Sequence, residues 1–226
     1  NEFVFTKEFF KPIEDSTSVY LTENEIQRIF EFDFDNQSLD NVRDLLIIAC
    51  WTGFRISDLS TISKENIKDN AIEVKQKKTG KPVSIPIHWQ IESILKKRNG
   101  NFPPTISDQK FNDYVKKVCR KVGIDETVKG SKRQQIKKGV YRKVTSDFPK
   151  YELISSHTGR RSFATNHYGV FPNIVIRSFT GHSDDKQLLN YIKIVPRDHF
   201  SAMQNYWNER RQHWEKQSAS TLKKIS

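Results

Sequence analysis

The sequence predicts a mainly α-helical domain with small β-hairpins, an α+β fold. Apolar residues recur at helical spacing in several segments, whereas short alternation of polar and apolar residues is confined to stretches near Ile72 and Val83. The 226 residues are 35% hydrophobic and include 15 Phe and 4 Trp, enough to fill a core. We expect a linker at 1–20, one domain at 21–195, and a C-terminal amphipathic helix and tail at 196–226.

The first part of the domain is predicted to hold three helices. Thr22 and Glu25 have capping-box spacing, which predicts a helix over Glu23–Phe30. Apolar residues at helical spacing from Leu39 to Cys50 predict a second helix, which Thr52-Gly53 would end. Arg55 is then expected in a turn before a short helix around Ser57–Thr61.

A hairpin and two further helices are predicted next. Alternation at Ile72–Val74 and again at Val83–Ile87 predicts two strands, with Lys78-Thr79-Gly80-Lys81 as their turn. Helical patterns then cover Trp89–Arg98 and Ser107–Val122.

The C-terminal half starts with a mixed segment, Val128–Leu153, which reads either as a second hairpin or as a basic loop. Ser155 or Ser156 can cap a helix over His157–Tyr168 that Gly169 closes. We expect shorter helices over Pro172–Phe179 and Asp184–Ile192, and a terminal amphipathic helix after Pro196 with Phe200, Met203, Trp207 and Trp214 on one stripe.

Charge favours a polyanionic partner. The 38 Lys plus Arg exceed the 27 Asp plus Glu, a formal net charge of +11. The positive charge is local, because Lys129–Lys143 holds seven basic residues and no acidic one, whereas Leu21–Ile72 holds ten acidic and five basic residues. A basic run of this kind is either a solvated loop or a nucleic-acid contact.

Composition argues against several classes of protein. Cys50 and Cys119 have the spacing of neither a zinc site nor a disulfide framework, so we expect reduced, buried thiols in a cytoplasmic protein. We find no apolar stretch long enough to cross a membrane and no signal-peptide core. No cofactor is expected.

Two arginines have the properties that a phosphate clamp requires. Arg55 follows Thr52-Gly53-Phe54, and Arg160 ends the motif His157-Thr158-Gly159-Arg160. A guanidinium is always charged and its planar fork fits two nonbridging phosphate oxygens. Asp58, one turn after Arg55, is either its ion-pair partner at the surface or the group that holds it in position.

Cutting a phosphodiester bond without a metal requires a nucleophile and an acid in addition to cations, and four other residues are candidates for these roles. His157 precedes Arg160 by three residues, and His182 follows Thr180-Gly181. Lys78 lies directly before Thr79-Gly80 and can protonate a leaving oxygen, although Lys75, Lys77 and Lys81 compete for this role. Tyr191, nine residues after His182, would be the nucleophile if positive charge stabilises its phenolate.

In this order and at these separations, the motifs resemble those of the tyrosine recombinases, also called the phage integrase family, in particular integrases of Bacteroides-type conjugative transposons and phages. The resemblance runs from about Leu21 to Ile194 and implies the catalytic-domain fold of that family. It implies that Tyr191 attacks a DNA phosphodiester to form a 3′-phosphotyrosyl intermediate, with strand exchange following, and that neither metal nor ATP is needed. It further implies that Arg55 and Arg160 clamp the phosphate, that Lys78 is the general acid, that His157 acts in acid–base chemistry or orients phosphate, and that His182 donates to phosphate.

The resemblance also carries expectations about partners and departures. Asp58 stands where many members have glutamate, and Thr180 where leucine is frequent. Family members grip double-stranded DNA with a separate N-terminal domain, for which 1–20 would be the linker. We expect a monomer in isolation, a synaptic tetramer on bacterial DNA, and a C-terminal helix that packs either in cis or on a neighbouring protomer. Candidate DNA-contacting residues are Lys75, Lys77, Lys81, Lys132, Arg133, Lys137, Lys138 and Arg161.

Three alternatives stay open on sequence alone. A type IB topoisomerase shares the same chemistry and would relax supercoils. A basic DNA-binding module without catalysis would use Arg55, Lys78 and Arg160 only to contact phosphates. A phosphate-ester hydrolase is disfavoured because no cluster of carboxylates and histidines has metal-site spacing.

Overall fold

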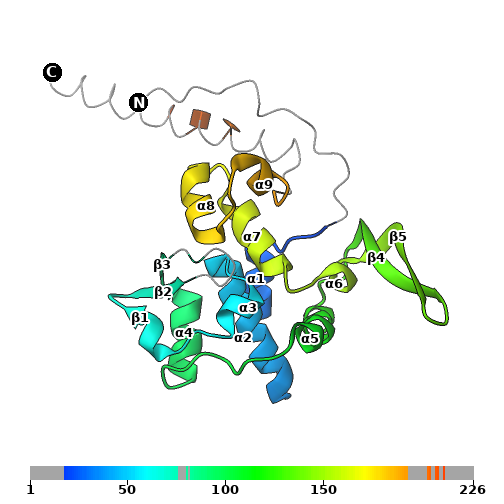
Figure 1. Ribbon diagram of the computed structural model, residues 1–226, viewed down its shortest axis with the longest axis horizontal. Helices are drawn as coiled ribbons and strands as arrows, with labels where there is room; N and C mark the ends of the chain where they lie inside the picture. The colour runs from blue at the N-terminus through cyan, green and yellow to red at the C-terminus, as the bar shows by residue number, and fades with distance from the viewer. Residues whose placement is uncertain are drawn as a thin grey trace, which may run out of the picture. The chain divides into compact units, whose positions relative to one another are not determined.

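The computed structural model describes residues 18–75, 80, 82–192, 203–204, 207–208 and 211. Compact packing divides the chain into one unit that ends at Ile192 and another that begins at Lys193, and the fold below is that of the first unit. Figure 1 shows helices gathered around α2, with two separate antiparallel β-ribbons. The predicted α+β class is confirmed.

Helix α2, Gln37–Thr52, forms the centre of this unit because its residues from Val42 to Cys50 are buried around the whole circumference. It contacts α1 (Glu23–Glu31), α4 (Trp89–Lys97), α5 (Asp108–Lys121) and α7 (Thr158–His167). A helix that is apolar on all sides belongs in a core. The other helices are amphipathic and cover it, so α2 is the element against which the site is positioned.

The start of each early helix follows from its capping chemistry. Thr22 and Glu25 form the predicted capping box: the threonine Oγ1 accepts from the Glu25 amide at 3.3 Å, and the Glu25 carboxylate accepts from the Thr22 amide at 2.7 Å. Ser107 caps α5 with its hydroxyl alone, which accepts from the Lys110 amide at 3.4 Å. The predicted helices in this half are confirmed to within one or two residues at their ends.

Asp44, in the middle of α2, connects this helix to the C-terminal end of α4 and also binds its neighbour Arg43. Its carboxylate is fully buried and accepts from Arg43 at 2.6 Å and from Arg98 at 2.7 Å, with Lys97 at 2.8 Å. A buried carboxylate is tolerated only when it is paired in this way.

The first sheet has the order β1-β2-β3, with β1 at Ile67–Lys68, β2 at Ala71–Lys75 and β3 at Pro82–Pro86. Its predicted hairpin is confirmed by antiparallel pairs such as Ile72 with Ile85 and Val74 with Val83. Lys77, Lys78 and Lys81 lie outside the described residues.

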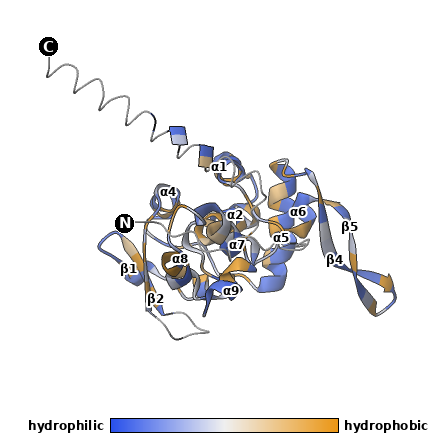
Figure 2. Cartoon of the chain, turned by 90° about the horizontal axis from the view of Figure 1, so that it is seen from above, coloured by the Kyte–Doolittle hydropathy of each residue, from blue (hydrophilic) through white to orange (hydrophobic). Residues whose placement is uncertain are grey.

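The second sheet is a long two-stranded ribbon, β4 (Thr127–Lys137) and β5 (Val140–Pro149). Of the two readings of this segment, the hairpin is therefore confirmed. Figures 1 and 2 show the ribbon running outward from α6, Lys150–Leu153, mostly in hydrophilic colours.

Three details of the C-terminal half differ from the sequence predictions. Neither Ser155 nor Ser156 caps α7: His157 is the residue before the helix, and the Thr158 hydroxyl instead accepts from the Ser155 amide at 2.9 Å. After α8 (Asn173–Thr180), α9 spans only Asp185–Leu189. Tyr191 therefore lies in the turn that follows α9 rather than within a helix.

The predicted terminal helix is described only in part. Residues 203–204, 207–208 and 211 are helical, and Met203 and Trp207 are exposed. Phe200 and Trp214 lie outside the described residues. Among the residues that the structure places, no helix has both the length and the apolar character needed to cross a bilayer.

Candidate active site

The turn that carries Arg55 has a fixed shape. Gly53 ends α2 with φ +68°, and a Cβ at this position would lie 2.8 Å from a ring carbon of Phe163. Glycine is needed both for the left-handed backbone and for the close approach of α7. Arg55 is the N-cap residue directly before α3, Ile56–Leu59, and its Nη1 lies 3.6 Å from Asp58 Oδ2.

Helix α7 brings Arg160 onto the same turn. Gly159 faces α2 so closely that a Cβ would lie 2.6 Å from the Ala49 Cβ. The next residue, Arg160, is 1% exposed, and its Nη1 donates to the carbonyl oxygen of Gly53 at 2.9 Å. The second arginine is therefore hydrogen-bonded to the turn that positions the first.

Several nitrogens in this region are buried without a hydrogen bond. Within the described ranges, Arg160 Nε and Nη2 and His182 Nε2 have no hydrogen-bond partner, and Arg55 Nη1 has only its 3.6 Å ion-pair contact with Asp58. Burial of Arg160 and the nearby charge of Arg55 lower the pKa of Arg160 to about 10, which leaves it cationic at neutral pH. Two arginines therefore share one carboxylate, and the remaining positive charge is what an anionic ligand would complement.

His182 is held in a defined orientation by Thr180. The Thr180 hydroxyl donates to the Ile176 carbonyl at 2.7 Å and lies 2.9 Å from His182 Nδ1. Because the hydroxyl hydrogen is used on the carbonyl, Nδ1 must be the donor, and the neutral ring then exposes a bare lone pair at Nε2. Burial, followed by the charges of Arg160, Arg55 and Arg177, lowers the pKa of His182 to about 4.

Tyr191 lies against these cations. Its ring centroid is 4.5 Å from that of His182, and the guanidinium carbons of Arg160 and Arg161 lie 5.9 and 5.5 Å from it. A pocket of the first unit is lined by Arg55, Gly181, His182, Ser183, Gln187, Asn190 and Tyr191. The predicted nucleophile thus shares one pocket with Arg55 and His182, and the buried Arg160 lies beside its ring.

His157 stands at the exposed edge of this group, directly before α7. Partial burial and then the charges of Arg161, Arg160 and Arg55 lower its pKa. It is therefore neutral at physiological pH, and can take up or pass on a proton beside the arginines.

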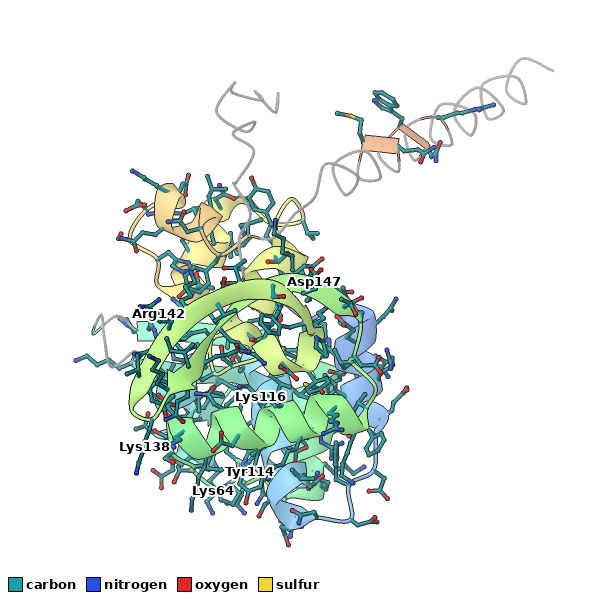
Figure 3. All side chains as sticks on the ribbon, turned by 90° about the vertical axis from the view of Figure 1, so that its right-hand side faces the viewer. Lys64, Tyr114, Lys116, Lys138, Arg142 and Asp147 are labelled. Atoms are coloured by element: carbon teal, nitrogen blue, oxygen red, sulfur yellow. The ribbon has the colours of Figure 1, made fainter. Side chains whose placement is uncertain are left out.

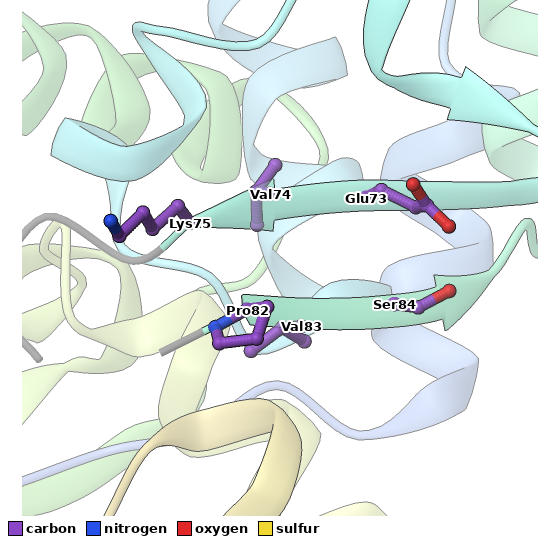
Figure 4. A pocket seen from close by; sticks show the side chains of 6 residues that line it. All are labelled: Glu73, Val74, Lys75, Pro82, Val83 and Ser84. Carbon is purple, nitrogen blue, oxygen red and sulfur yellow. The ribbon is translucent and has the colours of Figure 1, made fainter. Parts of the chain in front are cut away.

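The structure brings together five of the six predicted catalytic residues: Arg55, His157, Arg160, His182 and Tyr191. The sixth, Lys78, lies outside the described residues. Figure 4 shows Lys75 at the end of β2 and Pro82 at the start of β3, in a shallow hollow on that hairpin that contains none of the five.

Apart from Lys75, which ends β2, the candidate DNA-contacting residues that the structure describes fall into two groups. Arg161 belongs beside Tyr191, and its Nη1 donates to the Val19 carbonyl at 3.2 Å. Lys132, Arg133, Lys137 and Lys138 lie on or at the turn of the β4–β5 ribbon, and none of them lines the pocket.

Sequence reasoning missed residues that act through position. Ser183, Gln187 and Asn190 line the pocket, and Gly159 and Thr180 orient its charged groups. The signal that could have identified Thr180 is a hydroxyl two residues before a histidine. In the described residues, no cluster of three metal-binding side chains is present.

The chain resembles known proteins in both sequence and fold. The Phage integrase family profile matches residues 19–196, most of the chain. No curated protein matches the sequence.

Among solved structures, the XerA recombinase superposes with a TM-score of 0.54 at 18% identity, covering 89% of this chain and 67% of its own. A lambda integrase (75–356) dimer bound to a COC′ core site superposes with a TM-score of 0.55 at 19% sequence identity, covering 81% of this chain and 62% of its own. XerH bound to a palindromic difH substrate superposes with a TM-score of 0.53 at 17% identity, covering 88% of this chain and 54% of its own. The chain thus spans about half to two thirds of the length of these structures, and at such identities the likeness establishes the fold. Together with the profile match, it establishes that this chain belongs to the phage integrase family.

Proposed function

We propose that this chain is the catalytic domain of a site-specific DNA recombinase of the kind found in Bacteroides-type conjugative transposons and phages. The observation that supports this most directly is that Arg55, His182 and Tyr191 line one pocket and that the buried Arg160 lies beside the Tyr191 ring. A scissile phosphate bound there would accept from the arginines and lie beside the Tyr191 ring. The proposed catalytic domain spans residues 21–195.

In the proposed reaction, the Tyr191 oxygen attacks the phosphorus of a DNA phosphodiester. The new O–P bond forms as the bond to the 5′ oxygen breaks, which leaves a 3′-phosphotyrosyl ester and a free 5′ hydroxyl. Because the ester retains the bond energy, a second DNA strand can reverse the step without ATP or a metal. Arg55 and Arg160 neutralise the pentacoordinate transition state, in which the phosphate oxygens carry more charge than in the substrate.

Proton transfers are assigned to three groups. His182 presents Nε2 to the pocket and becomes a phosphate donor once it is protonated there. His157 receives or relays the Tyr191 proton. Lys78 protonates the departing 5′ oxygen, with Lys75, Lys77 and Lys81 as competitors.

The proposed partner is double-stranded bacterial DNA in the cytoplasm, with a tetramer at synapsis. Segment 196–226 is proposed to pack either in cis or on a neighbouring protomer, where Met203 and Trp207 would supply the apolar contact. Arg161, whose guanidinium carbon lies 5.5 Å from the Tyr191 ring centroid, is proposed to contact the DNA backbone beside the nucleophile.

Covalent capture from a DNA pool tests the proposal without knowledge of the target site. The chain is incubated with nicked duplexes of randomised sequence, and protein–DNA adducts that survive detergent are recovered and sequenced. We expect adducts on Tyr191 that vanish in Tyr191→Phe while DNA binding remains. Binding without adducts in the wild-type chain would instead support the non-catalytic basic module.

A further inference from the structure

The β4–β5 ribbon has two unlike faces. Residues paired across an antiparallel ribbon share a face, and faces alternate along each strand. We call the face that holds the pairs Arg133–Lys143 and Gln135–Tyr141 the outer face, and the face that holds Lys132–Val144 and Gln134–Arg142 the inner face. Outer-face residues are exposed along almost the whole ribbon, whereas inner-face residues are mostly half-buried or buried.

The inner face is explained by packing. Val128 pairs with the buried Phe148, and a Cβ on Gly130 would lie 2.2 Å from a Leu153 methyl group of α6. Lys132 forms an ion pair with Glu152 of α6 and lies 4.3 Å from the Phe148 ring centroid. These contacts attach the base of the ribbon to α6.

The outer face has no such explanation. Arg133 and Lys143 stand directly opposite each other, an arrangement of like charges that costs about 0.2–1 kcal/mol in a ribbon. No described carboxylate lies within ion-pair distance of either, and Asp147, near the base, is the one acidic residue in 127–149. The Arg133 guanidinium lies 6.0 Å from the Tyr141 ring centroid on the same face.

From these observations we infer that the outer face of the β4–β5 ribbon binds the phosphate backbone of duplex DNA, through Arg133 and Lys143, outside the catalytic pocket. An anion between the two cations would convert their repulsion into two charge-assisted hydrogen bonds. Residues of one face recur about every 7 Å along a strand, close to two phosphate steps of about 3.4 Å along the duplex axis. Gln135 adds a neutral donor to that face, as does one of the two hydroxyls of Ser131 and Thr145, which hydrogen-bond to each other at 2.5 Å.

Other features favour the outer face over the inner one. A duplex along the inner face would meet α6, which the base of the ribbon contacts. Figure 3 shows Arg142, which belongs to the inner face, and Lys138, at the turn of the ribbon. An isolated two-stranded ribbon gains little stability from its exposed part, so folding does not account for the basic residues of the outer face.

Two double variants with the same charge change test this inference, which rests on the proposed action on DNA. Arg133→Gln with Lys143→Gln removes two outer-face cations, whereas Lys132→Gln with Arg142→Gln removes two inner-face cations at adjacent positions. Binding to a fluorescent 40-base-pair duplex of arbitrary sequence is measured by anisotropy from 50 to 200 mM NaCl. Each phosphate contact contributes about 0.9 to the slope of log K against log salt concentration.

We expect the outer-face variant to reduce that slope by about 1.8 and the inner-face variant to leave it nearly unchanged. Equal reductions would show that only net charge matters and would overturn the inference, as would no reduction in either variant. Failure of the wild-type chain to bind DNA would count against the proposed function itself. Circular dichroism melting of both variants ensures that the ribbon and its domain remain folded.

Discussion

Replacing Gly159 with alanine tests whether close packing of α2 and α7 holds the two arginines together. The added Cβ would lie 2.6 Å from Ala49 Cβ, 3.1 Å from the Ala49 carbonyl carbon and 3.3 Å from the Cys50 amide nitrogen. Carbon atoms in contact lie about 3.5–4.0 Å apart, so the helices must separate by about 1 Å. None of these atoms belongs to a flexible side-chain end that could move aside.

The expected loss of stability is small. Overpacking costs about 1–3 kcal/mol, and the better helix propensity of alanine offsets up to about 1 kcal/mol. We therefore expect Gly159→Ala to fold, with a free energy of unfolding lowered by about 0–2 kcal/mol. The loss in rate should be larger, about 100-fold, because Arg160 moves by about 1 Å relative to Arg55.

Urea unfolding and the rate of covalent DNA capture measure the two effects separately. Ala49→Gly is the matched partner, since it removes the atom that the new Cβ would meet. The double variant should regain most of the lost rate, although glycine in α2 costs it about 1 kcal/mol of stability. Capture at the wild-type rate by Gly159→Ala alone, or no recovery in the double variant, would refute the reasoning.

Three further predictions concern the pocket itself. Arg160→Lys should slow covalent DNA capture by about 100- to 1,000-fold with little change in DNA affinity. The reason is that an ammonium group cannot donate to both the Gly53 carbonyl and a phosphate. A capture rate within threefold of wild type would contradict this. Thr180→Val should lower the capture rate by about tenfold by freeing His182, while Thr180→Ser retains the hydroxyl and most of the rate; equal rates in the two variants would argue against an orienting role. Burial lowers the pKa of His182 from 6.5 to about 4, so below pH 6.5 the unfolded chain takes up a proton that the folded chain excludes until about pH 4. Stability of the wild type should therefore decrease as the pH falls through this window. After a discount for screening by solvent, this group should contribute about 1–2 kcal/mol of the loss at pH 4.5, and urea unfolding at pH 7.5 and 4.5 should show that His182→Gln lacks this part.

The sequence predicted the elements that depend on local chemistry. The capping box at Thr22, the helix end at Gly53 and the alternation around Ile72 each involve neighbours within a few residues, and each is confirmed. The predicted end of α9 was wrong: the helix stops at Leu189 and not at Ile192. The apolar residues of this segment are compatible with a turn as well as with a helix. Periodicity alone does not register where backbone hydrogen bonding stops.

Contacts between distant segments could not be predicted from the sequence. The bond from Arg160 to the Gly53 carbonyl joins residues 107 apart, and the approach of Gly159 to Ala49 depends on how α7 crosses α2. Motif order indicated that the arginines act together, whereas only the packed helices give a reason for the glycine between His157 and Arg160. The two faces of the ribbon likewise required the strand register.

Polar groups at the pocket lower the stability of the free domain because they are positioned to bind a phosphate. A buried polar atom left without a hydrogen bond costs about 1–3 kcal/mol, and such atoms occur on Arg160 and His182, close to Tyr191. Phosphate oxygens would accept from the arginine nitrogens, and from His182 Nε2 once it is protonated, most strongly in the pentacoordinate transition state, where their charge is greatest. Since α2, α7 and the Gly53 turn hold these groups before DNA arrives, little of the binding energy is needed to orient them. The unpaired buried groups therefore lower the stability of the free domain. The same groups bind the transition state more strongly than they bind the DNA substrate.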